Sequence, residues 1–354
     1  MSKISVAVLG ATGMIGQRFV QMLEDHPWFE IEGLYASERS QGKRLGDVLK
    51  VRDHVYLDET MDRRIETMDI KKISENCRIA FSGIPSDLAG PTETDLAKAG
   101  VAVFTNAGSH RMDAHVPIII PEVNPGQFDA VKDQPTYGES GGYIVTNANC
   151  SSTGIAAPLH AINQAFGLKQ VFVSTYQALS GAGYPGVPSL DAVGNVVPFI
   201  SHEEEKMETE LAKMLGTYSE GEFRYAPFKV MANCARVPVI DGHLESLVLD
   251  TEAQPSLDEL EACLAGFRGE PQTLGLPSAP DQPIIVRHEE NRPQPVFDAM
   301  AGKPERARGM AVTIGRLRQS NGYYKAFAMS HNTLRGGAGG SVLNAELAKA
   351  KGIL

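Results

Sequence analysis

The stretch that decides the fold is ISVAVLGATGMIGQRFV, residues 4–20. Its apolar start predicts a β-strand, and Gly10, Gly13 and Gly16 separate that strand from a helix expected over residues 16–25. Glycines at such a turn allow a pyrophosphate to approach the backbone closely, and N–H groups at a helix N-terminus stabilise its charge. The spacing GxxGxxG is a variant of the dinucleotide-binding fingerprint, so this turn predicts a dinucleotide site.

Apolar runs and helical stretches continue to alternate after this turn. Strands are expected over residues 29–36, 79–82, 101–105 and 143–146, with a crossover helix over 87–100. This alternation is typical of βαβ units and a parallel sheet. After Cys150 the strand-like runs become longer, which favours a mixed or antiparallel sheet with helices on one face. Those runs are residues 169–177, 229–240, 244–250, 311–317 and 323–328.

The predicted fold class is therefore α/β, with a Rossmann-like dinucleotide-binding domain followed by an α+β domain that carries a mixed sheet. The first domain is expected over residues 1–149 and the second over 150–331. The segment 332–354, with a helix over 341–350 after a glycine-rich turn, is expected to pack back on the first domain.

Length and composition agree with two folded domains and exclude some classes. The chain has 354 residues and a net charge of −10, which argues against a nucleic-acid binder. No apolar run approaches the ~20 residues that a membrane span needs. The four cysteines have no CxxC spacing, so we expect reduced thiols in a cytoplasmic protein rather than a disulfide framework or a metal site.

The end of the second strand bears on the choice between NAD and NADP. A carboxylate there favours the ribose 2′-hydroxyl, whereas arginine and hydroxyl side chains suit a 2′-phosphate. The sequence supplies both signals, with Glu38 beside Ser37, Arg39 and Ser40. Arg39 with two serines favours NADP.

The segment NANCSST, residues 147–153, follows the strand expected over 143–146. A cysteine near the start of a helix, expected here from Ile155 onward, lies where N–H groups favour a thiolate and stabilise an oxyanion. Small polar neighbours distinguish Cys150 from an ordinary core cysteine. Pro158 must end or kink that helix or lie near its beginning.

The segment RVPVIDGH, residues 236–243, predicts a strand that ends in a turn and presents His243. Histidine is a natural proton shuttle for a thiol because its ordinary pKa is close to neutral. Strand alternation places Cys234, Arg236 and Pro238 on one face, so Cys234 is the second candidate for the nucleophile.

Together these segments resemble aspartate-β-semialdehyde dehydrogenase over nearly the whole chain. The segments YQALSGAGYPG (176–186) and SHEEEKM (201–207) look like those of the shorter branch found in archaea and fungi. The resemblance implies NADP-dependent reductive dephosphorylation of aspartyl 4-phosphate to aspartate semialdehyde through a cysteine thioester. It also implies a homodimer or homotetramer.

By that resemblance Cys150 is the acyl-forming thiol and His243 the acid/base. Arg236 would hold the substrate carboxylate and Glu203 its ammonium, although Glu204 and Glu205 leave that register open. The residues implied for phosphate and for orienting the acyl group are Arg111, Lys206, Gln177 and Asn149. The residues implied for the cofactor, beyond the glycines and the residues after the second strand, are Thr12, Met14, Ile15, Ser82, Gly83, Ser180, Gly181 and Asn332.

Several alternatives remain open at this point. Malonyl-CoA reductase performs the same thioester-to-aldehyde step, and N-acetylglutamyl-phosphate reductase also reduces an acyl phosphate. A dinucleotide-binding regulator without catalysis would lack a reactive thiol. From spacing alone, the charges of Glu203 to Lys206 fit a solvated helix face.

Overall fold

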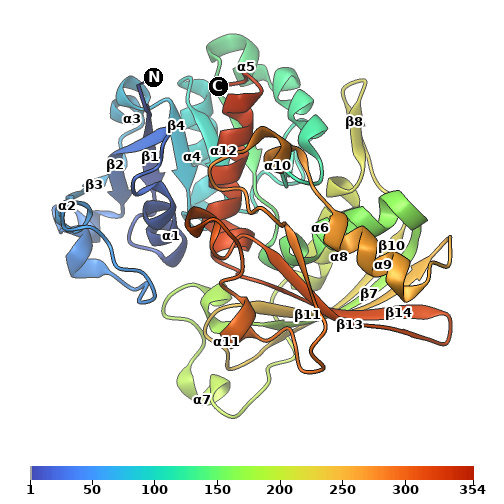
Figure 1. Cartoon of the computed structure of the whole chain (residues 1–354). Helices are drawn as coiled ribbons and strands as arrows, with labels where there is room; N and C mark the ends of the chain where they lie inside the picture. The colour runs from blue at the N-terminus through green and yellow to red at the C-terminus, as the bar shows by residue number, and fades with distance from the viewer. Residues whose placement is uncertain (1) are drawn as a thin grey trace.

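The computed structural model describes residues 2–354, which form two six-stranded sheets (Figure 1). The first sheet has the order β3-β2-β1-β4-β5-β6, and every neighbouring pair is parallel. This is the strand order of a Rossmann fold, so the predicted dinucleotide-binding architecture is confirmed. Its strands are β1 (Ile4–Leu9), β2 (Phe29–Ala36), β3 (Ile65–Thr67), β4 (Ile79–Ser82), β5 (Ala102–Thr105) and β6 (Tyr143–Thr146).

Helices cover both faces of the first sheet because its strands are apolar on both sides. One face packs against α1 (Met14–Leu23) and α12 (Gly339–Ala350), through side chains such as Phe19 and Leu343. The other face packs against α3 (Ile70–Asn76) and α4 (Ser86–Lys98), through Ile73 and Leu96. The final helix therefore completes the first domain, as Figure 1 shows for the red α12 beside the blue and cyan elements.

The first helix begins and ends two residues earlier than predicted. Gly13 is its N-cap, with extended backbone at φ −84° and ψ 167°, so Met14 is the first helical residue. The helix ends at Leu23, and Asp25 adopts a left-handed φ of 49°. A residue in that conformation cannot continue a right-handed helix.

The second sheet is mixed, in the order β10-β7-β11-β14-β13-β12. Its two outer pairs are parallel and its inner pairs antiparallel. Three helices bury one face of this sheet: α6 (Cys150–Phe166), α8 (Glu203–Met214) and α9 (Leu257–Gly266). The strands are β7 (Leu168–Gln177), β10 (Lys229–Arg236), β11 (His243–Thr251), β12 (Ile284–Arg287), β13 (Val312–Ser320) and β14 (Tyr323–Ser330).

The strand predicted over residues 229–240 is shorter in the structure. It ends at Arg236, because Pro238 has no N–H to donate to a neighbouring strand. The chain then turns through Gly242, at φ 95°, into β11. Cys234 and Arg236 do share a buried face, but Pro238 is exposed, so the predicted alternation stops at Arg236.

The remaining α-helices and strands are short and lie in the connections between the strands of each sheet. They are α2 (Asp58–Asp62), α5 (Pro135–Ser140), α7 (Ser189–Ala192), α10 (Glu270–Leu274), α11 (Pro295–Asp298) and the hairpin of β8 (Thr217–Ser219) with β9 (Glu222–Arg224). Within residues 2–354, none of the helices combines the length and the apolar character that a bilayer crossing requires.

Two buried polar contacts fix the C-terminal segment to the rest of the molecule. Arg335, just before α12, forms two hydrogen bonds to Glu122, with distances of 2.8 and 2.9 Å between nitrogen and oxygen. His26, after α1, contacts Glu346 of α12 at 2.8 Å. All four side chains are buried, so these contacts tie distant parts of the sequence together.

Candidate active site

The candidate nucleophile, Cys150, is the first residue of α6 and follows β6 after a three-residue connection. Asn149 is the N-cap, and its side-chain oxygen accepts hydrogen bonds from the N–H groups of Ser151 and Ser152 at 2.9 and 3.1 Å. This cap starts the helix five residues before the predicted Ile155. The thiol thus lies at the positive end of a 17-residue helix.

The small polar residues after Cys150 do not mark a solvated segment: Ser151 and Ser152 have no exposed surface. Their backbone N–H groups are bonded to the Asn149 cap, whereas their hydroxyl oxygens have no hydrogen-bond partner among the described residues. Pro158 lies well inside α6, which continues to Phe166, so the proline neither ends the helix nor lies near its beginning.

His243, the first residue of β11, brings its Nε2 atom to 3.3 Å from the Cys150 sulfur. The N–H of Ala178 donates to the other ring nitrogen, Nδ1, at 3.0 Å. Because Nδ1 accepts a hydrogen bond, the neutral ring carries its proton on Nε2, toward the sulfur. Burial lowers the pKa of His243 to about 3, and the positive charge of Arg236 adds to that effect.

The two candidate thiols differ in their surroundings more than in their acidity. Burial raises the pKa of Cys150 to about 12, with a further rise from Glu203, while Arg236 and Arg111 oppose it. Burial also raises the pKa of Cys234 to about 12. Cys234, however, packs in the core of the second domain with its sulfur 3.8 Å from that of Met207. Because the pKa of Cys150 is raised and that of His243 is lowered, the thiol of Cys150 and the imidazole of His243 are both neutral before substrate binds.

Arg236 lies at the end of β10 and is 6% exposed. Its Nη1 atom donates to the carbonyl of Ala178 at 2.7 Å. Among the described residues no carboxylate lies within ion-pair distance of this guanidinium. A Cβ at Gly181 would lie 2.8 Å from Nη1 of Arg236 and 3.0 Å from Cε1 of His243, so glycine is needed there to cover both side chains. A buried cation without a partner beside Cys150 is suited to receive an anion.

One face of α8 points toward this site, and the surroundings of its three glutamates differ. Glu203 is buried, and one of its oxygens accepts from Asn149 Nδ2 at 2.8 Å and from Gln177 Nε2 at 3.0 Å. Lys206 lies 3.8 Å from its other oxygen. Glu204 instead accepts from the backbone of Cys234, and Glu205 is exposed.

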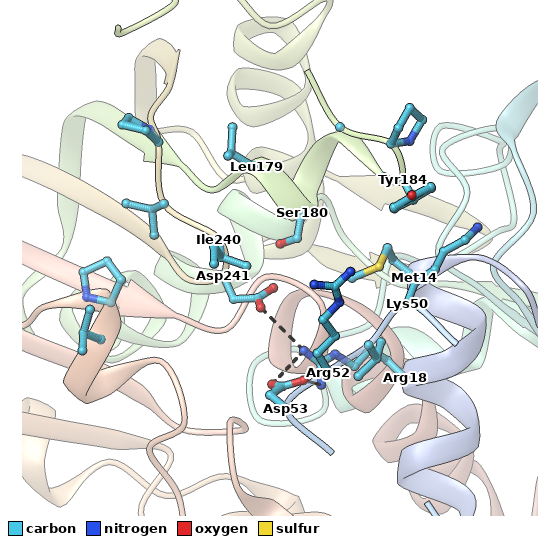
Figure 2. A pocket seen from close by; sticks show the side chains of 18 of the residues that line it. Met14, Arg18, Lys50, Arg52, Asp53, Leu179, Ser180, Tyr184, Ile240 and Asp241 are labelled. Atoms are coloured by element: carbon cyan, nitrogen blue, oxygen red, sulfur yellow. Dashed lines mark hydrogen bonds and ion pairs between the residues drawn. The ribbon is translucent and has the colours of Figure 1, made fainter. Parts of the chain in front are cut away.

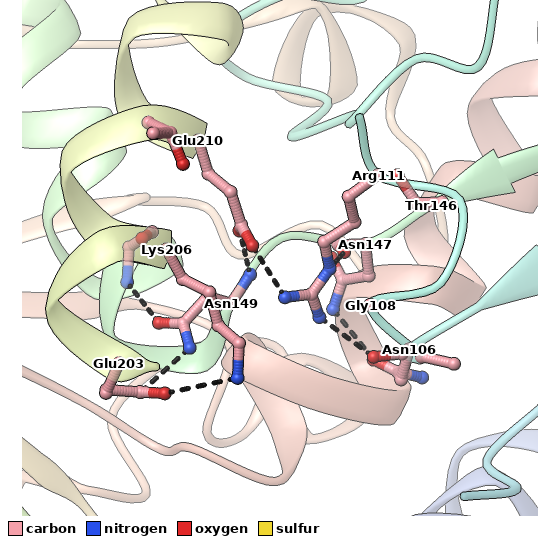
Figure 3. A network of polar contacts seen from close by, with 12 residues as sticks. Asn106, Gly108, Arg111, Thr146, Asn147, Asn149, Glu203, Lys206 and Glu210 are labelled. Carbon is pink, nitrogen blue, oxygen red and sulfur yellow. Dashed lines mark hydrogen bonds and ion pairs between the residues drawn. The ribbon is translucent and has the colours of Figure 1, made fainter. Parts of the chain in front are cut away.

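Arg111 is buried, and its guanidinium makes three hydrogen bonds (Figure 3). Its Nε donates to the carbonyl of Asn147, Nη2 to that of Asn106, and Nη1 to Glu210 of α8 at 2.9 Å. Sequence reasoning missed Glu210 and also Lys213, one helical turn further along α8. The available signal was the spacing of the charged residues 203, 206, 210 and 213, which places all four on one helix face.

The glycine turn after β1 has the geometry that an anion site requires. Gly10 adopts φ 79°, and a Cβ there would lie 2.7 Å from the carbonyl oxygen of Gly83. A Cβ at Gly16 would lie 2.0 Å from the carbonyl oxygen of Gly10. Gly13 supplies no side-chain cap, and the first turn of α1 contains no acidic residue. The N–H groups at this helix start are therefore available to an anion, with Thr12, Met14 and Ile15 partly exposed around them.

The other residues predicted for the cofactor lie in different settings. Ser37 and Arg39 are exposed directly after β2, where a short 3-10 turn begins, and Ser40 is half-buried. Ser82, at the end of β4, has no exposed surface, and its hydroxyl donates to Glu93 at 2.6 Å. That contact directs the Ser82 side chain into the interior, away from the glycine turn.

A cleft of about 890 Å³ opens between the two domains (Figure 2). Met14 and Ser180 line it from opposite sides, and Lys50 lies over the ring of Tyr184, 4.6 Å from its centre. Asn332 donates to the Ser180 hydroxyl at 2.8 Å and accepts from the N–H of Gly242 at 2.9 Å. Asn332 thus links Ser180 to the turn that presents His243.

The geometry defines a class of protein: a nucleotide-binding domain joined to a domain with a cysteine–histidine pair and a buried arginine that has no carboxylate partner among the described residues. Family models identify both domains. Residues 5–131 match the semialdehyde dehydrogenase NAD-binding domain, and residues 159–335 match the semialdehyde dehydrogenase dimerisation domain.

The chain belongs to the aspartate-semialdehyde dehydrogenase family. It is 45% identical over 352 residues to the aspartate-semialdehyde dehydrogenase of Methanothermobacter thermautotrophicus, covering 97% of this chain and 98% of the relative. It is 40% identical to that of Schizosaccharomyces pombe, with 99% of both chains covered. A crystal structure of the Candida albicans enzyme with NADP superposes with a TM-score of 0.88, at 37% identity and full coverage of both chains.

These relatives settle the activity and the branch. The protein interconverts aspartyl phosphate and aspartate semialdehyde, and its relatives are archaeal and fungal, as predicted. The relatives thus favour aspartate-semialdehyde dehydrogenase over the alternatives of malonyl-CoA reduction, N-acetylglutamyl-phosphate reduction and a regulator without catalysis.

Proposed function

We propose that the enzyme uses NADP and forms a thioester on Cys150. The observation that carries the proposal is the 3.3 Å contact between the Cys150 sulfur and His243 Nε2 at the start of α6. The thiol there has a proton-transfer group on one side and helix N–H groups on the other. Cys234 has no such partner, because it packs against Met207.

The cofactor would lie across the glycine turn, with its pyrophosphate at the start of α1 and its 2′-phosphate at Arg39, Ser37 and Ser40. Arg39 is exposed, and none of the described carboxylates forms an ion pair with it. It is therefore free to meet a phosphate. When bound, the cofactor supplies or accepts the hydride. Ser180 and Gly181 of the second domain would contact it, together with Asn332 at the start of the segment 332–354.

The substrate would be held by charge at both ends. Arg236 would receive the α-carboxylate, for which a planar guanidinium is suited, and Glu203 the ammonium. Lys206 and Arg111 would hold the phosphate. Asn149, which precedes Cys150 in the chain, and Gln177 both donate to Glu203. These two amides would orient the acyl group.

The hydrogen bonds of His243 determine how protons move during the reaction. His243 accepts the thiol proton at Nε2 only in the tautomer that carries its other proton on Nδ1. In that tautomer Nδ1 carries a proton and can no longer accept the hydrogen bond from the Ala178 N–H. Leaving this buried donor without a partner costs about 1–3 kcal/mol. The sulfur then attacks the acyl carbon, the bond to the phosphate oxygen breaks, and phosphate leaves. Once the acyl carbon of the thioester has accepted the hydride, His243 returns its proton to the oxygen of the resulting thiohemiacetal. When that proton is removed again, the C–S bond breaks and the aldehyde and the Cys150 thiolate are released.

We also propose a homodimer, or a dimer of dimers, formed through the uncovered face of the second sheet. Tyr176 pairs with Leu244 and Phe172 with Val248 on this face. Phe172 and Tyr176 are 37% and 39% exposed. The match to a dimerisation domain supports this choice of a second copy as the partner. The domain limits, 1–149 with 332–354 and 150–331, stay part of the proposal, which the packing of α12 on α1 supports.

The test is NADPH formation from aspartate semialdehyde with phosphate and CoA varied separately. The rate should depend on phosphate and not on CoA, and arsenate should replace phosphate. Replacing Lys206 with Ala should raise the phosphate requirement more than the semialdehyde requirement, and Arg236→Leu should do the reverse. Turnover that ignores phosphate would refute the proposed chemistry.

A further inference from the structure

Glu210 occupies the point where two parts of the active site meet. One carboxylate oxygen accepts from Arg111 Nη1 at 2.9 Å, and the other accepts from the backbone N–H of Asn149 at 2.8 Å. Glu210 is 3% exposed and Asn149 5% exposed. A single buried carboxylate therefore bridges the arginine proposed for phosphate and the residue that caps the catalytic helix (Figure 3).

Lys213, on the same face of α8, fixes the other end of the loop that carries Arg111. Its Nζ atom donates to the carbonyls of Arg111, Val116 and Asp113 at 2.6, 2.8 and 3.2 Å. Burial lowers the pKa of Lys213 to about 8. Helix α8 thus holds both the backbone and the guanidinium of Arg111.

Glu210 also limits what Arg111 can offer a ligand. A guanidinium has five N–H groups, and the three contacts to Asn147, Asn106 and Glu210 use three of them, which leaves 5 − 3 = 2. The two that remain are on the terminal nitrogens. Their direction depends on the contacts that hold the other three.

We propose that Glu210 is a positioning residue that couples the phosphate-binding arginine to the start of the catalytic helix. It touches neither Cys150 nor the expected substrate position in any contact described, and it acts through Arg111 and Asn149. This inference rests on the proposed function, because it takes Arg111 as a phosphate ligand and Cys150 as the nucleophile.

The isosteric change Glu210→Gln removes one of the two contacts by necessity. Both present contacts are made to N–H donors, so both oxygens must accept. A glutamine has one oxygen and one NH₂ group, and the NH₂ would face either Arg111 or the Asn149 N–H as a second donor. Either outcome disturbs the bridge without changing the volume of the side chain.

Two explanations of the role of Glu210 predict opposite changes in the phosphate KM of the Glu210→Gln variant. If the carboxylate merely neutralised Arg111, its removal would strengthen the attraction for phosphate and lower the phosphate KM. If it positions Arg111, its loss should raise the phosphate KM, by about tenfold or more, since small misplacements of a catalytic group cost factors of this size. The semialdehyde KM should change by less than about twofold, because Arg236 is not in the bridge.

The experiment compares four proteins: wild type, Glu210→Gln, Arg111→Ala and the double variant. For each, the phosphate KM, the semialdehyde KM and the rate of Cys150 alkylation by iodoacetamide are measured. We expect Glu210→Gln to raise the phosphate KM and to slow alkylation at least threefold. In the Arg111→Ala background, it should have little further effect on phosphate but should still slow alkylation. Glu205→Gln, on the exposed face of the same helix, is the matched control and should behave as wild type.

Several results would overturn the proposal. They are an unchanged or lowered phosphate KM in Glu210→Gln, additive effects with Arg111→Ala, or unchanged alkylation. Where Glu210→Gln fails to fold, Glu210→Asp keeps the charge but is too short to reach both partners, so it should show the same two defects. If wild-type turnover ignores phosphate, the proposed function fails, whereas the alkylation measurements still decide whether Glu210 positions Cys150.

Discussion

Two buried arginines should respond to the same substitution in opposite ways. Arg236 is 6% exposed and has one hydrogen bond, to a carbonyl, whereas Arg335 is 1% exposed and forms two hydrogen bonds to Glu122. Arg335→Leu leaves the Glu122 carboxylate buried and unpaired, which should cost about 3–5 kcal/mol of unfolding free energy. Arg236→Leu leaves no charge behind.

The expected stability change for Arg236→Leu is small because two effects oppose each other. The carbonyl of Ala178 loses its donor, at a cost of about 1–3 kcal/mol. Removing a cation that burial has already destabilised gives back free energy of similar size, since burial lowers the pKa of Arg236. The net change should stay within about 1 kcal/mol of wild type.

For catalytic activity, Arg236→Leu should have the larger effect of the two substitutions. A substrate carboxylate that loses a buried charge partner should forfeit about 2–4 kcal/mol, which is roughly 30-fold to 1,000-fold in kcat/KM for aspartate semialdehyde. The assays are urea unfolding and initial rates on the same preparations. A loss of 3 kcal/mol or more of stability in Arg236→Leu, comparable to Arg335→Leu, would show that Arg236 is a structural residue and would refute the reasoning.

Three further predictions concern the thiol, the cofactor and pH. Cys150→Ala should abolish turnover and keep NADP binding, whereas Cys234→Ala should stay active; activity assays with cofactor titration check both. Arg39→Ala should weaken NADP binding roughly tenfold to a hundredfold and NAD binding little. The Kd values of both cofactors test this, and equal losses of affinity would contradict a contact between Arg39 and the 2′-phosphate. The pKa values of His243 and His331 are lowered by burial to about 3 and about 4, below the ordinary 6.5, so between pH 4 and 6.5 the unfolded chain binds more protons. The unfolding free energy should therefore rise with pH in that window, by up to about 1.4 kcal/mol per pH unit for each histidine, and His331→Asn should reduce the slope in chemical denaturation.

The sequence predicts the first sheet well because its strands are short apolar runs separated by helices and glycine turns. The spacing of apolar residues and the residue types that form turns are local properties of the sequence, so β1, β2 and β4 fall at the expected residues. The length of β10 was harder to predict, because the pattern of apolar residues continues past Arg236 while the pairing stops at Pro238.

The site shows the limits of the same reasoning. Motifs mark Cys150, His243 and Arg236, but the partners that orient them are distant in sequence. Glu210 lies 61 residues from Asn149 and 99 from Arg111, and in the sequence it is one more charge on an acidic helix. The Ala178 N–H that fixes the His243 tautomer is a backbone group, which no pattern of side chains reveals.

The return of α12 to the first sheet has a consequence for synthesis on the ribosome. His26 and the sheet core contact Glu346, Leu343 and Leu347, which are among the last residues to be made. At roughly 5–20 residues per second, the 339 − 150 = 189 residues between the starts of α6 and α12 take roughly 10–40 s to translate. Throughout that time the sheet face shared by α1 and α12 has only α1 to cover it. The packing of the nucleotide-binding domain is therefore completed only when the last residues of the chain have been made.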